Sequence, residues 1–173
     1  MNIFLPYENN IVESVQALDD LRLQKQLVEV YELLVLAIRE QQEGHEIKAG
    51  HYHHPVYLFY KNNVKFLAYY GWKCCEEYLW RFHKSHKLRD YFMYKMYDLF
   101  IEYKGKLIPQ PYYTPYYMEG SKGQPNYIRT TENVGELFKL KLIVKWESDK
   151  SKGREPKWTN REVPKFYTNY LNA

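Results

Sequence analysis

The sequence predicts an all-α protein, organised as a single compact domain over residues 1–173. Three observations lead to this prediction. Apolar residues recur at helical spacing in several segments, residues able to cap a helix precede most of these segments, and a proline-rich stretch interrupts them. At 173 residues and 45% hydrophobic content, the chain can enclose one core. We therefore expect packed helices with a long Tyr/Pro-rich loop and an irregular C-terminal arm.

The first helix is expected after a short apolar entry that ends at Pro6. Asn9 or Asn10 can cap this helix, and its apolar stripe follows at helical spacing: Ile11, Val12, Val15 and Leu18. A second helix should begin at the adjacent residues Asp19 and Asp20. These acids offer a cap and a charge that suits the positive end of the helix dipole.

The segment from Asp19 to Ile38 is predicted to be the helix around which the chain is organised. One of its sides is apolar: Leu23, Leu27, Val30, Leu34 and Ile38. Its polar residues fall within roughly a 100° sector of the helix: Arg22, Lys25, Gln26 and Glu29. Further along, the polar face becomes apolar at Leu33 and Leu36. A polar stripe that runs into a core indicates a pocket.

This polar stripe has two interpretations. It can be a solvated helix face with a Lys25–Glu29 ion pair, which would contribute about 0.3–0.5 kcal/mol. Alternatively, Glu29 is a catalytic carboxylate that acts on a sugar or on water, while Arg22 and Lys25 bind phosphate.

The polar run over residues 40–50 is expected to be a loop, broken by Gly44 and Gly50. It leads to a short helix from about Val56 to Lys61, with His54 as its cap. Pro55 supports this start, because proline is well tolerated in the first helical turn.

Three histidines within residues 51–54 raise the question of a metal site. No cysteine and no regular histidine spacing accompanies them, so we expect no metal there. A role in the local loop is one alternative. The other is that His54 reaches the Glu29 pocket as an acid–base partner.

Two more helices are expected after this point. Asn62 or Asn63 can cap the first, whose apolar face runs from Val64 to Phe82, and the second spans about Leu88 to Tyr103. Basic residues lie around the turn between them and are expected to be solvated, where they could also contact phosphates: Arg81, His83, Lys84, His86, Lys87 and Arg89.

From Lys104 to Asn126 the chain is rich in tyrosine, and four prolines exclude a regular helix: Pro109, Pro111, Pro115 and Pro125. Loops of this length in compact domains are usually functional or mobile. This loop can be an aromatic lid that faces the substrate, or it can wrap around the helices with its tyrosines packed on them.

The last major helix is expected after Asn133, which forms a capping-box pattern with Glu136. Arg129 precedes this helix and could bind a phosphate at its N-terminus, although a surface arginine is the alternative. The following polar segment over residues 148–156 reads as a linker, and a terminal arm then contains three expected anchors: Trp158, Phe166 and Tyr170.

Composition limits the class of protein. The net charge of +4 permits nucleic-acid binding without requiring it. The 19 tyrosines exceed what a small core can bury with satisfied hydroxyls, so some could stack on bases, unless they reflect compositional bias. The adjacent Cys74 and Cys75 cannot form a normal structural disulfide, which fits a reducing cytoplasm. We expect a cytoplasmic protein without a signal peptide or membrane span.

Three segments resemble the pyrimidine-dimer DNA glycosylase (endonuclease V) family, specifically its small bacterial and phage branch. They are FLPY at residues 4–7, LDDLRLQKQLVEV at residues 18–30 and GHYHHPVYLF at residues 50–59. The resemblance covers roughly residues 1–90, with a weaker similarity in YIRTTEN and WTNREVP. The residues that match the pattern of this branch are Asp20, Arg22, Lys25, Glu29, His54 and Pro55.

The resemblance implies a layer of crossing helices that binds damaged DNA and cleaves an N-glycosidic bond. In characterised members, the attacking group is an α-amine exposed when the initiator methionine is removed, and a glutamate on the first long helix assists it. Here the bulky Asn2 would normally leave Met1 in place, so the candidate nucleophile is the amine of Met1. A simple helix alignment puts the glutamate of the family near Gln24, more than a turn before Glu29.

We therefore predict a nucleic-acid-directed N-glycosylase with weak lyase activity at most, acting in DNA repair. The expected catalytic residues are Glu29, Asp20 and His54, and the expected substrate or phosphate ligands are Arg22, Lys25, Gln26 and Arg129. No metal, cofactor, membrane or obligatory protein partner is expected, and the substrate is DNA or a nucleotide. The alternatives are a non-catalytic nucleic-acid-binding module of this fold and a hydrolase of free or modified nucleotides.

Overall fold

The computed structural model of the chain describes residues 3–7, 10–47, 53–103, 116–118, 127–129 and 134–173. Within these residues it contains seven helices and two short strands. In chain order they are α1 (Ile11–Ala17), α2 (Asp20–Glu43), α3 (Pro55–Tyr60), α4 (Val64–Phe82), α5 (Arg89–Tyr103), β1 (Tyr116–Met118), β2 (Tyr127–Arg129), α6 (Val134–Lys150) and α7 (Lys165–Leu171). The predicted all-α class of crossing helices is confirmed.

Three of the predicted helix caps are confirmed. Asn10, His54 and Asn63 each accept a hydrogen bond from a backbone N–H in the first turn of α1, α3 and α4, respectively. Such bonds satisfy donors that the start of a helix leaves without intrahelical partners. The predicted start of a second helix at Asp19 and Asp20 is also confirmed, because α1 ends at Ala17 and α2 begins at Asp20.

The loop predicted to follow Arg39 is wrong at its start, since α2 continues to Glu43. Its last turn consists of strong helix formers, and the Arg39 guanidinium lies 3.4 Å from the Glu43 carboxylate one turn later. The helix ends at Gly44, whose φ of 69° lies in the left-handed region that favours glycine.

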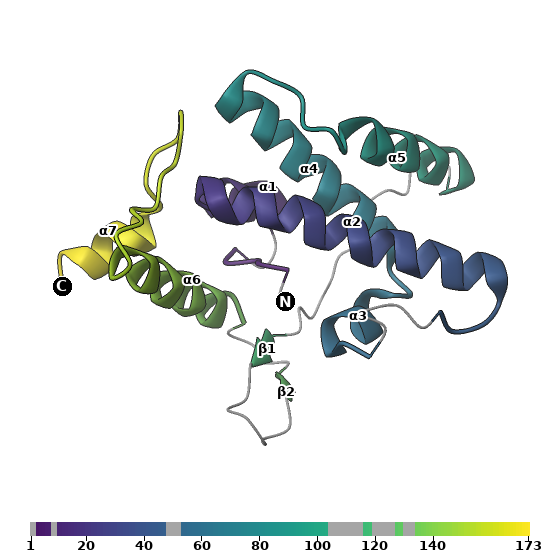
Figure 1. The fold of residues 1–173 in the computed structure, drawn as a ribbon, viewed down its shortest axis with the longest axis horizontal. Helices are drawn as coiled ribbons and strands as arrows, with labels where there is room; N and C mark the ends of the chain where they lie inside the picture. Colours follow the sequence, from purple (N-terminus) through teal and green to yellow (C-terminus); the bar gives the residue numbers. More distant parts are fainter. Residues whose placement is uncertain (1–2, 8–9, 48–52, 104–115, 119–126, 130–133) are drawn as a thin grey trace.

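Helix α2 crosses the centre of the molecule and packs against α4, which in turn packs against α5 (Figure 1). The contact between α4 and α5 depends on Gly71. A Cβ atom at this position would lie 2.1 Å from the Phe92 ring, so only glycine lets α5 approach this closely. Helices α6 and α7 lie on the other side of α2 (Figure 1).

The N-terminal segment, residues 3–5, is buried beside α2 (Figure 1). Its Phe4 ring packs edge-on against Phe138 of α6, with 5.8 Å between the ring centroids. The segment therefore lies in the core between α2 and α6, next to the polar stripe of α2.

The predicted loop from Lys104 to Asn126 contains an unexpected strand. β1 pairs with β2 in antiparallel register, with Tyr117 opposite Ile128, and this hairpin contacts α6 and α3 (Figure 1). The rest of the loop lies outside the described residues, as does the Asn133 cap proposed for α6.

Two of the three anchors expected in the C-terminal arm are confirmed. Trp158 is buried and Phe166 stacks on Trp146 of α6 at 5.7 Å between the ring centroids. The prediction for Tyr170 is wrong, because 49% of this residue is exposed. Tyr167 is buried instead, because it lies on the face of α7 that packs on Trp146. The expected linker is wrong at its start, as α6 extends to Lys150.

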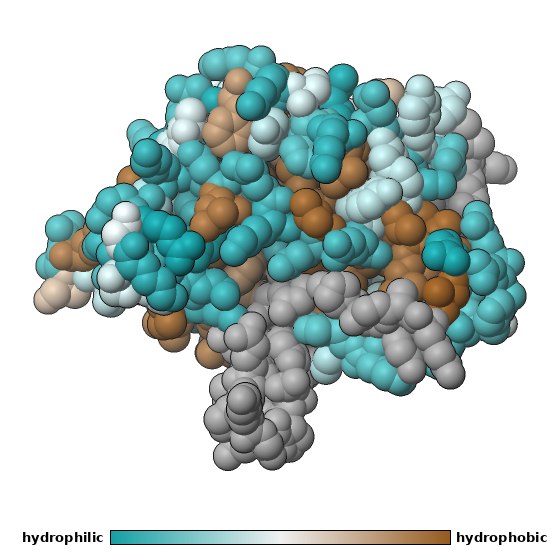
Figure 2. Space-filling model, in the orientation of Figure 1, coloured by the Kyte–Doolittle hydropathy of each residue, from teal (hydrophilic) through white to brown (hydrophobic). Residues whose placement is uncertain are grey.

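The face of the molecule in Figure 2 is largely hydrophilic, with hydrophobic residues in separate patches. In the described part of the chain, no helix combines the length and the apolar character needed to cross a membrane.

Candidate active site

Glu29 lies on α2 at the edge of the core and is half-buried. Its carboxylate oxygen Oε2 accepts a hydrogen bond of 3.0 Å from the side-chain amide nitrogen of Gln26, one helical turn earlier. Gln26 itself is buried, with 1% of its surface exposed. The polar stripe therefore presents one carboxylate, held by an amide from inside the protein.

The same Gln26 amide connects α2 to two other parts of the chain. Its oxygen accepts a hydrogen bond of 3.0 Å from the backbone N–H of Phe4. The Tyr70 hydroxyl of α4 lies 3.0 Å from this amide oxygen and 2.9 Å from the carbonyl oxygen of Phe4, so its single proton can be donated to either acceptor. Glu29 is thus linked through one side chain to the N-terminal segment and to α4.

Burial raises the pKa of the Glu29 carboxyl, and the negative charge of Glu32 adds to this rise. Positive charges act in the opposite direction, those of Lys145 and Lys25 among the described residues. A carboxyl group whose pKa is moved toward neutrality is suited to exchange protons during a reaction. The setting of Glu29 therefore fits acid–base or electrostatic catalysis.

Arg22 lies in the interior, with 8% of its surface exposed. Its guanidinium donates to the Asp19 carboxylate at 3.2 Å and forms a second ion pair with Asp149 of α6. A third bond of 3.4 Å runs to the backbone carbonyl of Lys145. Arg22 thus binds α2 to α6, and this use of its donors argues against contact with a phosphate.

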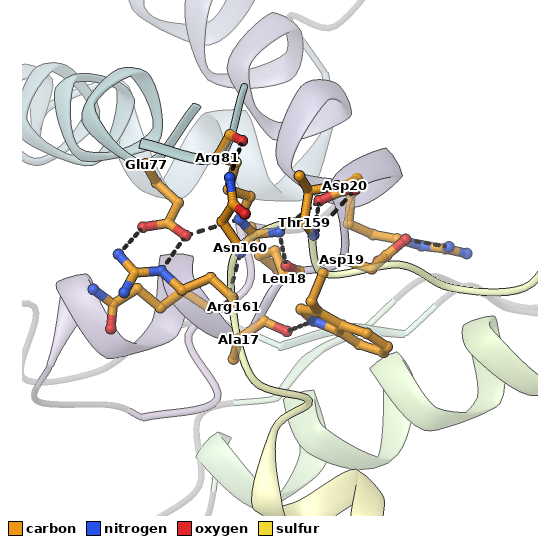
Figure 3. A network of polar contacts seen from close by, with 12 residues as sticks. Ala17, Leu18, Asp19, Asp20, Glu77, Arg81, Thr159, Asn160 and Arg161 are labelled. Carbon is orange, nitrogen blue, oxygen red and sulfur yellow. Dashed lines mark hydrogen bonds and ion pairs between the residues drawn. The ribbon is translucent and has the colours of Figure 1, made fainter. Parts of the chain in front are cut away.

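Asp20 belongs to a second polar network (Figure 3). Its carboxylate accepts hydrogen bonds from the Arg81 guanidinium at 3.1 Å and from the Thr159 hydroxyl at 2.7 Å. These contacts hold the start of α2 to α4 and to the C-terminal arm. They favour a structural role for Asp20 over a catalytic one.

Arg81 is at the centre of this network (Figure 3). Its guanidinium donates to the backbone carbonyls of Leu18 at 2.7 Å and Gln16 at 2.9 Å, and to the Glu77 carboxylate at 2.8 Å. The prediction that Arg81 is solvated is wrong, because only 1% of it is exposed. These carbonyls lie at the end of α1, where they lack helical partners and need a donor.

The C-terminal arm completes the network through Arg161 (Figure 3). Its guanidinium donates two bonds of 2.8 Å to the two oxygens of Glu77. This pairing raises the pKa of Arg161. The arm is therefore bound to α4 by a bidentate ion pair, the geometry in which arginine binds carboxylates most strongly.

A family model described as pyrimidine dimer DNA glycosylase matches residues 1–90, which is just over half of the 173 residues. The chain belongs to the pyrimidine dimer DNA glycosylase family. No curated protein and no solved structure matches it. The matched residues include Glu29 and the three residues of its hydrogen-bond chain, which are Gln26, Phe4 and Tyr70.

In this pyrimidine dimer DNA glycosylase family member, the predicted site residues do not all gather in one place. Lys25 is exposed one turn before Glu29, whereas Gln26 is internal, which argues against phosphate binding by Gln26. His54 caps α3 through its ring nitrogen Nδ1, which accepts the Val56 N–H at 3.2 Å. Its participation beside Glu29 stays a prediction.

Three further positions bear on the predicted site. Arg129 is the last residue of β2 and pairs in register with Tyr116, while its side chain lies outside the described part. Met1 also lies outside the described residues. Gln24, where a simple alignment put the glutamate of the family, is exposed on the far side of α2 from Gln26.

The cavity of about 580 Å³ between α1 and the C-terminal arm is lined by other residues, including Tyr7, Gln16, Arg161 and Lys165. The pocket expected at the polar stripe does not coincide with this cavity, because Glu29 is not among its lining residues.

The contribution of Tyr70 and Phe4 does not follow from the sequence pattern. Both lie in segments whose apolar residues predict only that they fill the core. The one available signal is chemical: a tyrosine on a buried helix face needs a partner for its hydroxyl. That signal says that a partner exists, but it cannot identify Phe4 and Gln26.

Proposed function

We propose that this protein is a DNA N-glycosylase that cleaves the glycosidic bond of a damaged or modified base, with Glu29 as its catalytic carboxylate. The observation that carries the proposal is the setting of Glu29. It is a half-buried carboxylate with a raised pKa, bound by Gln26 and lying within the residues that match the family.

The ionised Glu29 carboxylate would act on the sugar side of the bond. As the bond between sugar and base breaks, its electron pair leaves with the base and positive charge develops on the sugar. The carboxylate stabilises this charge and accepts a proton from the attacking water, whose oxygen bonds to the sugar carbon. The departing base takes up a proton, so that the products are the cleaved base and an abasic sugar. In a pyrimidine dimer, the cleaved base stays joined to the neighbouring pyrimidine.

Access to the bond requires the nucleotide to leave the base stack, because an enzyme cannot reach this atom within a duplex. Lys25 is the candidate for phosphate contact nearest to Glu29 along α2, and Arg129 remains a second candidate. Residues 1–173 would act as one domain, since ion pairs bind α6 and the C-terminal arm to α2 and α4.

An amine nucleophile is the alternative to water. If the amine of Met1 attacks the sugar, it forms a covalent amine-linked intermediate that borohydride reduces and traps. Trapped protein–DNA adduct would assign the attack to an amine and explain an associated lyase activity, while its absence during base release would assign the attack to water.

The decisive experiment measures cleavage of the glycosidic bond, called base release here, by mass spectrometry of free base and of abasic sites in the DNA. Both products are followed because a base cut from its sugar within a pyrimidine dimer stays joined to its neighbour. The purified protein is incubated with duplexes that contain pyrimidine dimers or other altered bases, with undamaged duplex and with free nucleotides. We expect base release from an altered duplex alone. Salt-dependent DNA binding without base release would favour a binding module, and release from nucleotides alone would favour a nucleotide hydrolase.

The pH dependence of the reaction provides a further prediction. The ionised form of Glu29 is required, and burial raises the pKa of this carboxyl above the ordinary glutamate value of 4.5. As the pH falls, base release should therefore begin to decline while the pH is still above 4.5. The measurement is kcat/KM for base release from about pH 4 to pH 8. An activity that stays constant down to pH 4.5 would contradict this assignment, since a carboxyl with a raised pKa is more than half protonated at that pH.

A further inference from the structure

We propose that Tyr70 is a positioning residue, which holds the Gln26 amide in the orientation that donates a hydrogen bond to the Glu29 carboxylate. The inference rests on the proposed function of Glu29. It extends this function to Tyr70 of α4, which is linked to Glu29 through the Gln26 amide. Its basis is the arrangement of donors and acceptors around one buried amide.

The orientation of the Gln26 amide follows from its neighbours. A backbone N–H can only donate, so the atom 3.0 Å from the Phe4 nitrogen must be the amide oxygen. The amide nitrogen then faces Glu29 Oε2, also at 3.0 Å. A reversed amide would direct two N–H groups at the Phe4 N–H and leave two oxygens facing each other at Glu29.

Tyr70 restrains the Gln26 side chain in this orientation. Its hydroxyl lies between two acceptors, the Gln26 oxygen and the Phe4 carbonyl, and its single proton can be donated to either of them. The Tyr70 hydroxyl therefore links the N-terminal segment and the Gln26 side chain through one shared proton.

The environment of the cluster keeps water from replacing these bonds. Tyr70 is 0% exposed, Gln26 is 1% exposed and Phe4 is 5% exposed. Burial also raises the pKa of Tyr70 well above that of a free tyrosine, so its hydroxyl keeps its proton. Hydrogen bonds in such a setting have fixed geometry, and a missing partner is costly.

The consequence for Glu29 concerns its charge and position. A hydrogen bond donated to a carboxylate favours the ionised form and lowers the pKa. Burial and the charge of Glu32 raise the pKa of Glu29, whereas the charges of Lys145 and Lys25 lower it. The bond from Gln26 acts in the same direction as these two lysines. If Tyr70 loses its hydroxyl, the Gln26 amide loses one of the groups that hold it, and the bond to Glu29 weakens.

The test is an NMR titration of the Glu29 side-chain carboxyl in protein labelled at the glutamate carboxyl carbons. It compares the full-length wild type with the variants Tyr70→Phe and Gln26→Leu. Gln26→Leu removes the donor and should raise the pKa of Glu29 by roughly one unit. Tyr70→Phe leaves Gln26 in place and should raise this pKa by a smaller amount.

The matched control is Tyr167→Phe. Its hydroxyl donates to Glu147 at 2.7 Å in the C-terminal part of the protein, and the residue is 3% exposed. This variant also removes the hydrogen bond of a buried tyrosine, so it should lose similar stability. The pKa of Glu29 should stay at the wild-type value in this variant.

Kinetics add a second readout. In Tyr70→Phe, we expect kcat for base release to fall by about 10- to 100-fold with KM nearly unchanged, because the carboxylate is misplaced after the substrate has bound. The acid limb of the pH profile should move to higher pH by the same amount as the Glu29 pKa measured by NMR.

The outcomes separate this inference from the proposed function. An unchanged Glu29 pKa in Tyr70→Phe, whatever Gln26→Leu does, would overturn the positioning role even if the wild type releases base. A wild type that releases no base would overturn the proposed function, while the titration would still decide whether Tyr70 positions Glu29 through Gln26.

Discussion

Glu29→Gln should reduce base release by at least about 100-fold, the lower bound for loss of a positioned acid–base group. Glutamine has nearly the shape of glutamate but can neither accept a proton nor balance positive charge on the sugar. Since Glu29 is only half-buried, the fold should tolerate the exchange. The measurement is single-turnover base release, with DNA affinity followed at the same salt concentration.

The matched control for this variant is Glu32→Gln. Glu32 is an exposed carboxylate one turn further along α2, and its charge acts on Glu29 in the direction that raises the pKa. Its removal should leave base release within about twofold of the wild type, in keeping with a weak interaction between exposed charges. Equal rates for Glu29→Gln and the wild type would exclude Glu29 from the mechanism.

Arg81→Met should cause the largest loss of stability, about 3–5 kcal/mol in the free energy of unfolding. Methionine fills much of the volume of arginine but donates no hydrogen bonds. The variant would leave the Gln16 and Leu18 carbonyls without their donor and remove a partner from Asp20 and Glu77. Urea unfolding followed by circular dichroism measures this loss.

Arg39→Met is the comparison for Arg81→Met. Arg39 forms an ion pair of 3.4 Å with Glu43, and its side chain is 55% exposed. Its replacement should cost less than about 0.5 kcal/mol. If Arg81→Met were as mild as Arg39→Met, then the network in Figure 3 would not hold α1, α2 and α4 together.

Local sequence signals located most of the helices because these signals act over a few residues. Asn10, His54 and Asn63 cap helices where their side chains can reach an N–H two or three residues away. After Arg39, the polar character of the next residues predicts a loop, but the helix continues to Glu43. Polar residues with high helix propensity extend a helix as readily as they form a loop.

The candidate site was predictable in part. Periodicity placed four polar residues in one sector of α2: Arg22, Lys25, Gln26 and Glu29. In the structure, Arg22 and Gln26 are buried, Glu29 is half-buried and Lys25 is exposed. It could not separate their roles. Which side chain stays accessible depends on the segments that pack on α2, and those segments are distant in sequence.

The sequence alone determined the helical class, the starts of α1 to α5 and the resemblance to a glycosylase family, because each depends on local pattern or on a motif. It did not predict α7, since the C-terminal arm was expected to be irregular. Only the tertiary structure decided the partners of the buried charges. Arg22 meets Asp149 and Arg81 meets Asp20 through contacts between separate helices. Charged groups enter a core only with partners, and no rule of spacing along the chain identifies those partners.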